Sequence, residues 1–113
     1  MTAWAALSEK AWQSFVIDMA KWNGWRVYHA LPVKNELGVW RTATQGDNGF
    51  PDLVLAHPTR GTIFAELKSA TGRLSDDQIA WIGVLKASGA EVYVWRPSDR
   101  LQVAEILTKD PTE

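Results

Sequence analysis

The sequence predicts an α/β domain with a mixed β-sheet flanked by helices, in the element order α-β-β-β-α-β-α. Three observations lead to this fold class. Apolar residues recur at helical spacing in two stretches, each preceded by a serine suited to a helix N-cap. Short runs rich in β-branched and aromatic residues lie between and after them. The last two such runs are joined by a helical stretch, and this crossover predicts parallel strands in an otherwise antiparallel sheet.

The chain has 113 residues, which fits a single domain over residues 1–113 with a core of its own. Cysteine is absent, which excludes disulfides and thiolate-bound zinc and fits a reducing compartment. We find no run of about 18 apolar residues and no signal peptide, so we expect a cytoplasmic protein without membrane contacts. The net charge of −1 means that nucleic-acid binding would need a local basic patch. Most of the seven tryptophans are expected in the core or at an interface.

The first helix is predicted to run from Glu9 to about Trp22, with Ser8 as its N-cap, after a flexible segment over residues 1–7. Its apolar stripe has helical spacing and consists of Trp12, Phe15, Val16, Met19 and Ala20. Glu9 and Gln13 lie at the edge of this stripe. Glu9 therefore either stabilises the helix N-terminus electrostatically or contributes to a site beneath the helix.

Residues 25–30 predict a strand that ends near His29, a residue suited to a supporting role in a site or to a structural one. A long connection over residues 31–48 follows, and it carries Lys34 and Arg41. Connections of this length are usually functional or mobile. This one either covers a ligand or forms a surface loop that Trp40 fixes to the body of the protein.

A β-hairpin is predicted by the runs 49–56 and 63–68 on either side of a turn that contains proline and glycine. With residues 58–61 in the turn, His57 lies opposite Thr62, and Asp52 lies opposite residues 66–68. Glu66 and Lys68 are two residues apart and share one face of their strand. Two carboxylates and an ammonium then meet at one end of an apolar hairpin. They form either a site for a divalent cation or an ordinary surface ion pair.

The second half of the chain continues with Ser75 and Gln78 in a capping box, followed by a helix to about Ala87. Gln78 begins the face of this helix that we expect to pack on the sheet. The run 91–96 alternates as a strand until Pro97, after which a short helix runs to about Leu107. Residues 109–113 are expected to be flexible.

Several of these pieces occur together in a recognisable order. They are a helix with Glu9, the pair Pro51-Asp52, Glu66-Leu67-Lys68, Gly72-Arg73-Leu74-Ser75 with Gln78, and the strands around Trp25-Arg26-Val27 and Val92-Tyr93-Val94. The combination resembles the PD-(D/E)xK nuclease superfamily. In particular, it resembles the VRR-NUC family in its compact, stand-alone bacteriophage form, over about residues 8–98.

This resemblance implies a restriction-endonuclease-like core and a metal-dependent nuclease. Asp52 and Glu66 match the family's metal ligands, and the backbone carbonyl of Leu67 matches a third ligand. Lys68 matches the family's catalytic lysine. Glu9 corresponds to a helix glutamate that often joins the metal site. The resemblance also matches Gln78 to a glutamine beside the catalytic residues, and it implies a homodimer that acts on branched DNA.

The chemistry of these side chains agrees with that implication. Hard carboxylate oxygens suit Mg²⁺, with Mn²⁺ as a substitute. The cations expected to contact DNA phosphates, or else to remain solvated surface charges, are Arg26, Lys34, Arg41 and Arg73. Gln13 and His29 are expected to support the site.

We therefore expect a Mg²⁺-dependent endonuclease that hydrolyses DNA phosphodiester bonds, selective for branched, junction or flap DNA. The main alternative is a catalytically inactive DNA-binding or assembly module of the same fold. A third interpretation is a small-molecule or protein-interaction domain in which the acidic cluster is incidental. Salt-sensitive DNA binding separates the first two from the third, and metal-dependent cleavage separates the first from the second.

Overall fold

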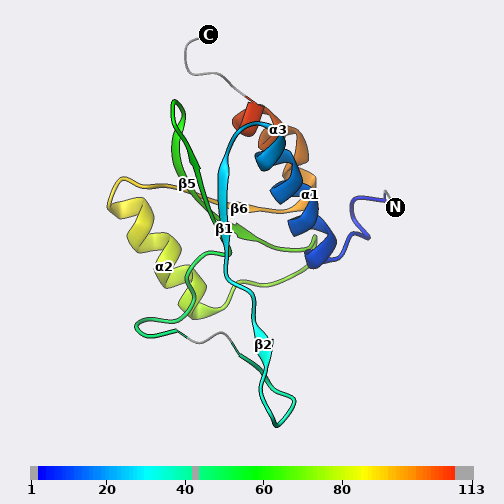
Figure 1. The fold of residues 1–113 in the computed structure, drawn as a ribbon, viewed down its shortest axis with the longest axis vertical. Coiled ribbons are helices and arrows are strands. Elements are labelled where there is room, and N and C mark those ends of the chain that lie inside the picture. Colours follow the sequence, from blue (N-terminus) through cyan, green and yellow to red (C-terminus); the bar gives the residue numbers. More distant parts are fainter. Residues whose placement is uncertain (1–2, 42–43, 109–113) are drawn as a thin grey trace.

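A computed structural model of the chain describes residues 3–41 and 44–108 (Figure 1). Its helices are α1 (Glu9–Trp22), α2 (Asp76–Ala87) and α3 (Arg100–Thr108), with a short 3-10 helix over Pro97–Asp99. Its strands are β1 (Arg26–His29), β2 (Val33–Lys34), β3 (Trp40–Arg41), β4 (Leu53–His57), β5 (Gly61–Leu67) and β6 (Glu91–Trp95). The predicted α/β class and order are confirmed, with the β2–β3 hairpin as an addition. No helix within the described ranges is long and apolar enough to cross a bilayer.

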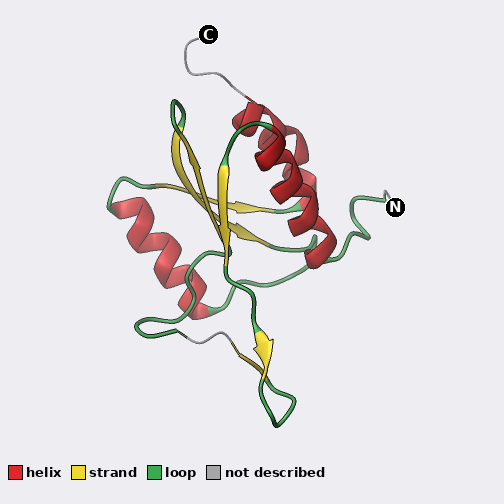
Figure 2. Cartoon of the chain, viewed as in Figure 1, coloured by secondary structure: helices red, strands yellow, loops and turns green. Residues whose placement is uncertain are grey.

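The main sheet has the strand order β1-β4-β5-β6 (Figure 2). Strand β4 is antiparallel to both β1 and β5, and β5 is parallel to β6. Because α2 connects the two parallel strands, the predicted crossover and the mixed sheet are confirmed.

The register of the β4–β5 hairpin is one residue tighter than expected. His57 pairs with Gly61, not with Thr62, and Leu53 pairs with Ala65. Gly61 has a φ of 108°, a conformation that glycine adopts without strain and that lets strand pairing begin one residue earlier. Extending the register by one step places Asp52 opposite Glu66, as the hairpin pattern predicts.

Helices α1 and α3 lie together on one side of the sheet and α2 on the other (Figure 1). The α1–α3 side holds the main core, which is formed by Trp12, Val16, Ala20, Trp25, Leu53, Leu55, Ile63, Ala65, Leu67, Trp95, Val103 and Leu107. Successive strand residues point to opposite faces, so Glu66, between Ala65 and Leu67, faces away from this core and towards α2.

The carbonyl of Trp95 joins three elements at one end of the sheet. It accepts a hydrogen bond from the indole N–H of Trp12 at 2.9 Å and another from the backbone N–H of Lys68 at 3.1 Å. The bond from the Trp12 indole thereby holds α1 at the end of β5. The N-cap is as predicted, because the Ser8 hydroxyl accepts the N–H of Ala11.

Part of the expected flexible segment at residues 1–7 makes defined contacts, while residues 1–2 and 109–113 lie outside the described ranges. The ring of Trp4 packs edge-on against Trp12 and Phe15, and the guanidinium of Arg100 lies 5.1 Å from it. Phe15, which we expected to be buried in the α1 stripe, is 36% exposed. It lies at the margin of the stripe, where Trp4 covers only part of it.

The connection over residues 31–48 differs from the expected loop. It contains the β2–β3 hairpin, which extends away from the main sheet (Figure 1). Trp40 does not fix it to the body of the protein, since 63% of this side chain is exposed. Residues 42–43 lie outside the described ranges.

Replacing Trp12 by Phe keeps an aromatic ring in the core but removes the N–H that the Trp95 carbonyl accepts. We expect the free energy of unfolding to fall by about 2 kcal/mol, from the lost hydrogen bond and the smaller ring. Urea denaturation followed by circular dichroism measures it. In the control Trp22→Phe, the altered side chain is 91% exposed, so the change should stay within about 0.5 kcal/mol. Equal losses in both variants would contradict the role given to this bond.

Candidate functional site

Asp52 lies immediately before β4, at the end of the sheet where β5 finishes. One of its carboxylate oxygens, Oδ2, accepts the backbone N–H of Leu67 at 2.9 Å. This bond fixes the carboxyl group across the hairpin, next to the Glu66 carboxyl. Pro51 is buried, so the backbone on the N-terminal side of Asp52 is also held.

Gly49 explains how the segment before Asp52 reaches its position. Its φ is 93°, and a Cβ atom there would lie 2.4 Å from the backbone carbonyl carbon of Asp77 in the first turn of α2. Only glycine tolerates both conditions. The next residue, Phe50, packs edge-on against Trp81 and Phe64 at centroid distances of 5.0 and 5.9 Å. Sequence reasoning missed these contacts of Gly49 and Phe50 because they join segments that are distant in the sequence.

Glu66 is the one charged residue of the described chain that is fully buried, with 1% of its surface exposed. Its Oε1 accepts a hydrogen bond from the Gln78 side-chain amide at 3.2 Å, whereas its Oε2 has no partner among the described residues. Burial, reinforced by the adjacent Asp52, raises the pKa of the Glu66 carboxyl to about 9, and the positive charge of Lys68 offsets part of this rise. A buried carboxylate with a free oxygen requires a proton or a cation.

Gln78 takes part both in the capping box of α2 and in a hydrogen bond to Glu66. Its backbone N–H donates to the Ser75 hydroxyl and its side-chain oxygen accepts the Ser75 N–H, which confirms the capping box. The amide nitrogen of the same side chain remains free to donate to Glu66. Gln78 therefore positions Glu66 while it caps α2.

Lys68 and Glu9 meet beside the two carboxylates. The Lys68 ammonium lies 3.9 Å from Oε1 of Glu9, and the Lys68 side chain is only 13% exposed. Glu9 itself is more open, at 46%. The structure therefore brings together Glu9 and Lys68 with Asp52, Glu66 and Gln78.

The loop that follows Lys68 is held by Arg96. One guanidinium nitrogen, Nη1, donates to the carbonyls of Ser69 and Gly72, both at 2.7 Å. A Cβ atom on Gly72 would lie 3.1 Å from the Ser69 hydroxyl and 3.5 Å from Cδ of Lys68. Arg96 thus supports the backbone that carries Lys68. Sequence reasoning missed this role, because both bonds join segments that are distant in the sequence.

The other predicted residues are distributed around this group. His29 is half-buried and pairs with Leu53, next to Asp52, and Gln13 is half-buried on α1. Arg73 is exposed just after the Lys68 loop. The remaining predicted DNA contacts are not at the carboxylates: Arg26 pairs with Ala56 at the far end of β1, and Lys34 and Arg41 lie on the β2–β3 hairpin.

Asp52 and Glu66 fit a divalent cation by their chemistry. Each has one carboxylate oxygen held by a protein hydrogen bond, and Oε2 of Glu66 is buried without a partner. A bound cation would relieve the cost of burying this charge. Within the described ranges, no three His, Cys, Asp or Glu side chains are arranged as a complete metal cluster. Asp52 and Glu66 would supply two carboxylates, and further protein or water oxygens would supply the other ligands, a pattern typical of Mg²⁺.

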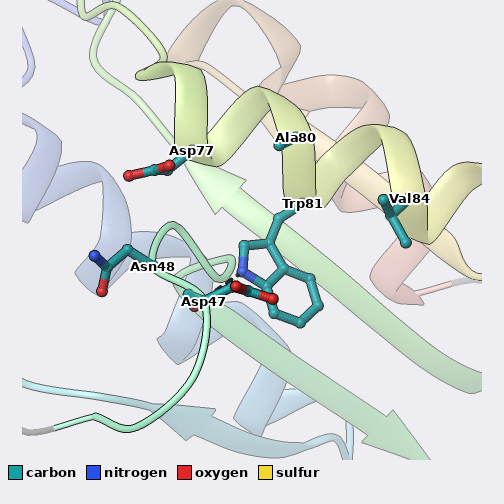
Figure 3. Close-up of a pocket in the computed structure, with 6 residues that line it drawn as sticks. All are labelled: Asp47, Asn48, Asp77, Ala80, Trp81 and Val84. Atoms are coloured by element: carbon teal, nitrogen blue, oxygen red, sulfur yellow. Dashed lines mark hydrogen bonds between the residues drawn. The ribbon is translucent and has the colours of Figure 1, made fainter.

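A hollow in the described surface lies elsewhere, between α2 and the segment before Gly49 (Figure 3). It measures about 250 Å³ and is lined by Asp47, Asn48, Asp77, Ala80, Trp81 and Val84. Figure 3 shows the Trp81 indole reaching from α2 towards this segment, and its N–H donates to the Asp47 carbonyl at 3.2 Å. The acidic lining of the hollow disfavours phosphate.

Comparison with known proteins gives a family and a fold. The family model for the VRR-NUC domain matches residues 10–99. Among solved structures, one titled "VRR_NUC domain protein" is similar over 88% of this chain and 90% of its own, with a TM-score of 0.54 and 19% sequence identity. No curated protein matches the chain.

The raised pKa of Glu66 predicts how the metal-free protein responds to pH. Unfolding returns the carboxyl to its ordinary pKa of 4.5, so the folded protein holds the proton more tightly. The resulting stabilisation is complete below about pH 4.5 and is lost as the pH rises towards about 9. In EDTA, we expect Tm to fall more between about pH 5.5 and 8.5 in the wild type than in Glu66→Gln, which cannot ionise.

Differential scanning calorimetry at the two pH values measures this difference. Glu105→Gln, a change at an exposed position of α3, is the control and should behave as the wild type does. A wild-type decline no steeper than that of Glu66→Gln would contradict the buried, proton-binding state of Glu66.

Proposed function

Since the chain belongs to the VRR-NUC domain family, a family of nucleases, we propose that it is a metal-dependent endonuclease that hydrolyses DNA phosphodiester bonds. The observation that carries this proposal is the buried Glu66 carboxylate, whose free oxygen lies in the same cluster as Asp52 and Lys68. An incidental surface cluster would not bury a carboxylate without a full set of partners, because that burial costs stability.

Asp52 and Glu66 are the proposed metal ligands, with the Leu67 carbonyl and Glu9 as further candidates. When bound there, Mg²⁺ or Mn²⁺ would lower the pKa of a coordinated water and neutralise charge on the scissile phosphate. The protein prepares both carboxylates by holding one oxygen of each, through the N–H of Leu67 and the amide of Gln78. Gln78 thus acts through Glu66 as a positioning residue.

Lys68 is the proposed catalytic lysine. Its side chain is largely enclosed, and Arg96 braces the loop that follows it, so its ammonium occupies a defined position beside the carboxylates. There it either stabilises negative charge that develops on the phosphate or orients the attacking water. Its proximity to Glu9 supports a fixed placement of the ammonium.

DNA binding is proposed to extend from the carboxylates along the neighbouring surface. Arg73 is the predicted phosphate contact next to the site, Lys34 and Arg41 are predicted contacts on the β2–β3 hairpin, and Arg26 would contact a phosphate further along β1. His29 and Gln13 are proposed to support the site from β1 and α1. We also propose that the active form is a homodimer and that it prefers branched DNA.

Cleavage of labelled linear duplex, flap and four-way-junction DNA tests this function directly. We expect nicking or cleavage in Mg²⁺ or Mn²⁺ and none in EDTA. Glu66→Gln and Lys68→Ala should each lower the rate at least about a hundredfold, because each removes charge from the position where the phosphate reacts. Glu105→Gln is the matched control for a lost carboxylate and should keep wild-type activity.

The outcomes separate the alternatives. Salt-sensitive DNA binding without cleavage of any substrate would reject the endonuclease and favour the DNA-binding or assembly module. Cleavage that persists in Glu66→Gln would place the chemistry outside this carboxylate cluster.

A further inference from the structure

We propose that the β2–β3 hairpin binds DNA beside the carboxylate site and that Trp40 stacks on an unpaired nucleobase there. This inference rests on the proposed nuclease function and adds a base-binding position to it. Three features carry it: where the hairpin leaves the sheet, what its surface presents, and how firmly its turn is built.

The strand register places the base of the hairpin at the end of the sheet that carries the site. Strand β1 ends at His29, which pairs with Leu53, the residue after Asp52. Leu53 also pairs with Ala65, the residue before Glu66. Lys34 follows His29 by five residues, so their Cα atoms are at most about 18 Å apart. That span corresponds to about five base pairs, well within one turn of duplex DNA.

The hairpin combines an open aromatic ring with cations on both of its faces. Lys34 and Trp40 are direct cross-strand partners, and the Lys34 ammonium lies 5.2 Å from the centre of the Trp40 ring. Val33 and Arg41 form the next pair, which points to the opposite face. Proteins that bind single-stranded DNA combine such aromatic platforms with cations that follow the phosphates.

The turn of the hairpin is preorganised. The Asn35 side chain accepts the backbone N–H groups of Leu37 and Val39 at 2.9 and 3.0 Å. The Asn35 backbone bonds to Val39 and Gly38, and Gly38 adopts a φ of 78°. A defined turn reduces the ordering cost of binding, so Trp40 is presented in a fixed arrangement.

Nevertheless, no other helix or strand of the described chain makes an extensive contact with the hairpin. Strands of two residues are marginal alone, and its apolar side chains are exposed: Val33, Leu37, Val39 and Trp40. Its cations Lys34 and Arg41 outnumber the one acid, Glu36, which favours a polyanion as the occupant. A paired duplex hides its base faces, whereas an unpaired base exposes the face that an open indole can cover.

Equilibrium binding to two DNAs of the same sequence tests the proposal. One is a complete duplex, and the other has a short unpaired stretch with 2-aminopurine in it. All proteins carry Glu66→Gln, so that binding is measured without cleavage. Trp40→Ala should weaken binding to the unpaired DNA about tenfold and abolish 2-aminopurine quenching, with a change under about twofold on duplex. Trp40→Phe should retain most of the affinity, because it retains an aromatic face.

Trp22→Ala is the matched control, since Trp22 is more exposed than Trp40 but lies at the end of α1. It should leave both affinities unchanged. Lys34→Gln should weaken binding to both DNAs equally. It should also reduce the slope of log affinity against log salt concentration by about one, as expected for a phosphate contact.

Three results would overturn the proposal: no loss in Trp40→Ala, an equal loss on both DNAs, or a wild-type dimer in sedimentation that Trp40→Ala dissociates. The last would show that the hairpin binds a second copy of this chain. Trp40-dependent binding without metal-dependent cleavage by the unmodified protein would reject the endonuclease but support the hairpin assignment. Metal-dependent cleavage by the unmodified protein, together with DNA binding that does not depend on Trp40, would support the endonuclease but reject the hairpin assignment.

Discussion

The structure depends on the burial of one carboxylate, that of Glu66, beside a second one at Asp52. Isolation from water is costly for a carboxylate, and the raised pKa of Glu66 expresses that cost. An ordinary core would place an apolar residue between Ala65 and Leu67. The protein instead holds one oxygen of Glu66 through Gln78 and leaves the other free. A site that accepts a cation explains this arrangement better than a contribution to stability does.

The scaffold around the pair is built from contacts between segments that are distant in the sequence. The Trp95 carbonyl joins the indole of Trp12 to the backbone of Lys68 and so fixes α1, which carries Glu9, at the end of β5. On the opposite side of the sheet, Gly49 packs directly against the first turn of α2. Each contact lies close to a residue of the site, so the core and the site share their positioning elements. The fold therefore delivers five polar side chains to one end of a sheet with little freedom to rearrange.

Local patterns predicted the regular elements, because caps and periodicity act within a few residues. The Ser75–Gln78 capping box could be predicted from such a local pattern. The hydrogen bond from Gln78 to Glu66 could not, because it depends on how α2 packs. The hairpin register was one residue off because turn length alone does not fix where pairing begins. The bracing role of Arg96 arises from tertiary contacts, and no spacing rule describes it. The exposure of Trp40 was missed because tryptophan is more often buried, and only the fold shows that this side chain is largely open to solvent.

The most direct test of this account is Mn²⁺ binding to the protein without DNA, measured by electron paramagnetic resonance of the free ion. Cleavage assays combine metal binding with substrate binding, whereas this titration examines the carboxylate pair alone. The account predicts saturable binding to the wild type, weakened at least about tenfold by Glu66→Gln and by Asp52→Asn, and unchanged by Glu105→Gln. Equal Mn²⁺ affinity in the wild type and Glu66→Gln would contradict it, since the buried carboxylate would then have no part in holding a cation.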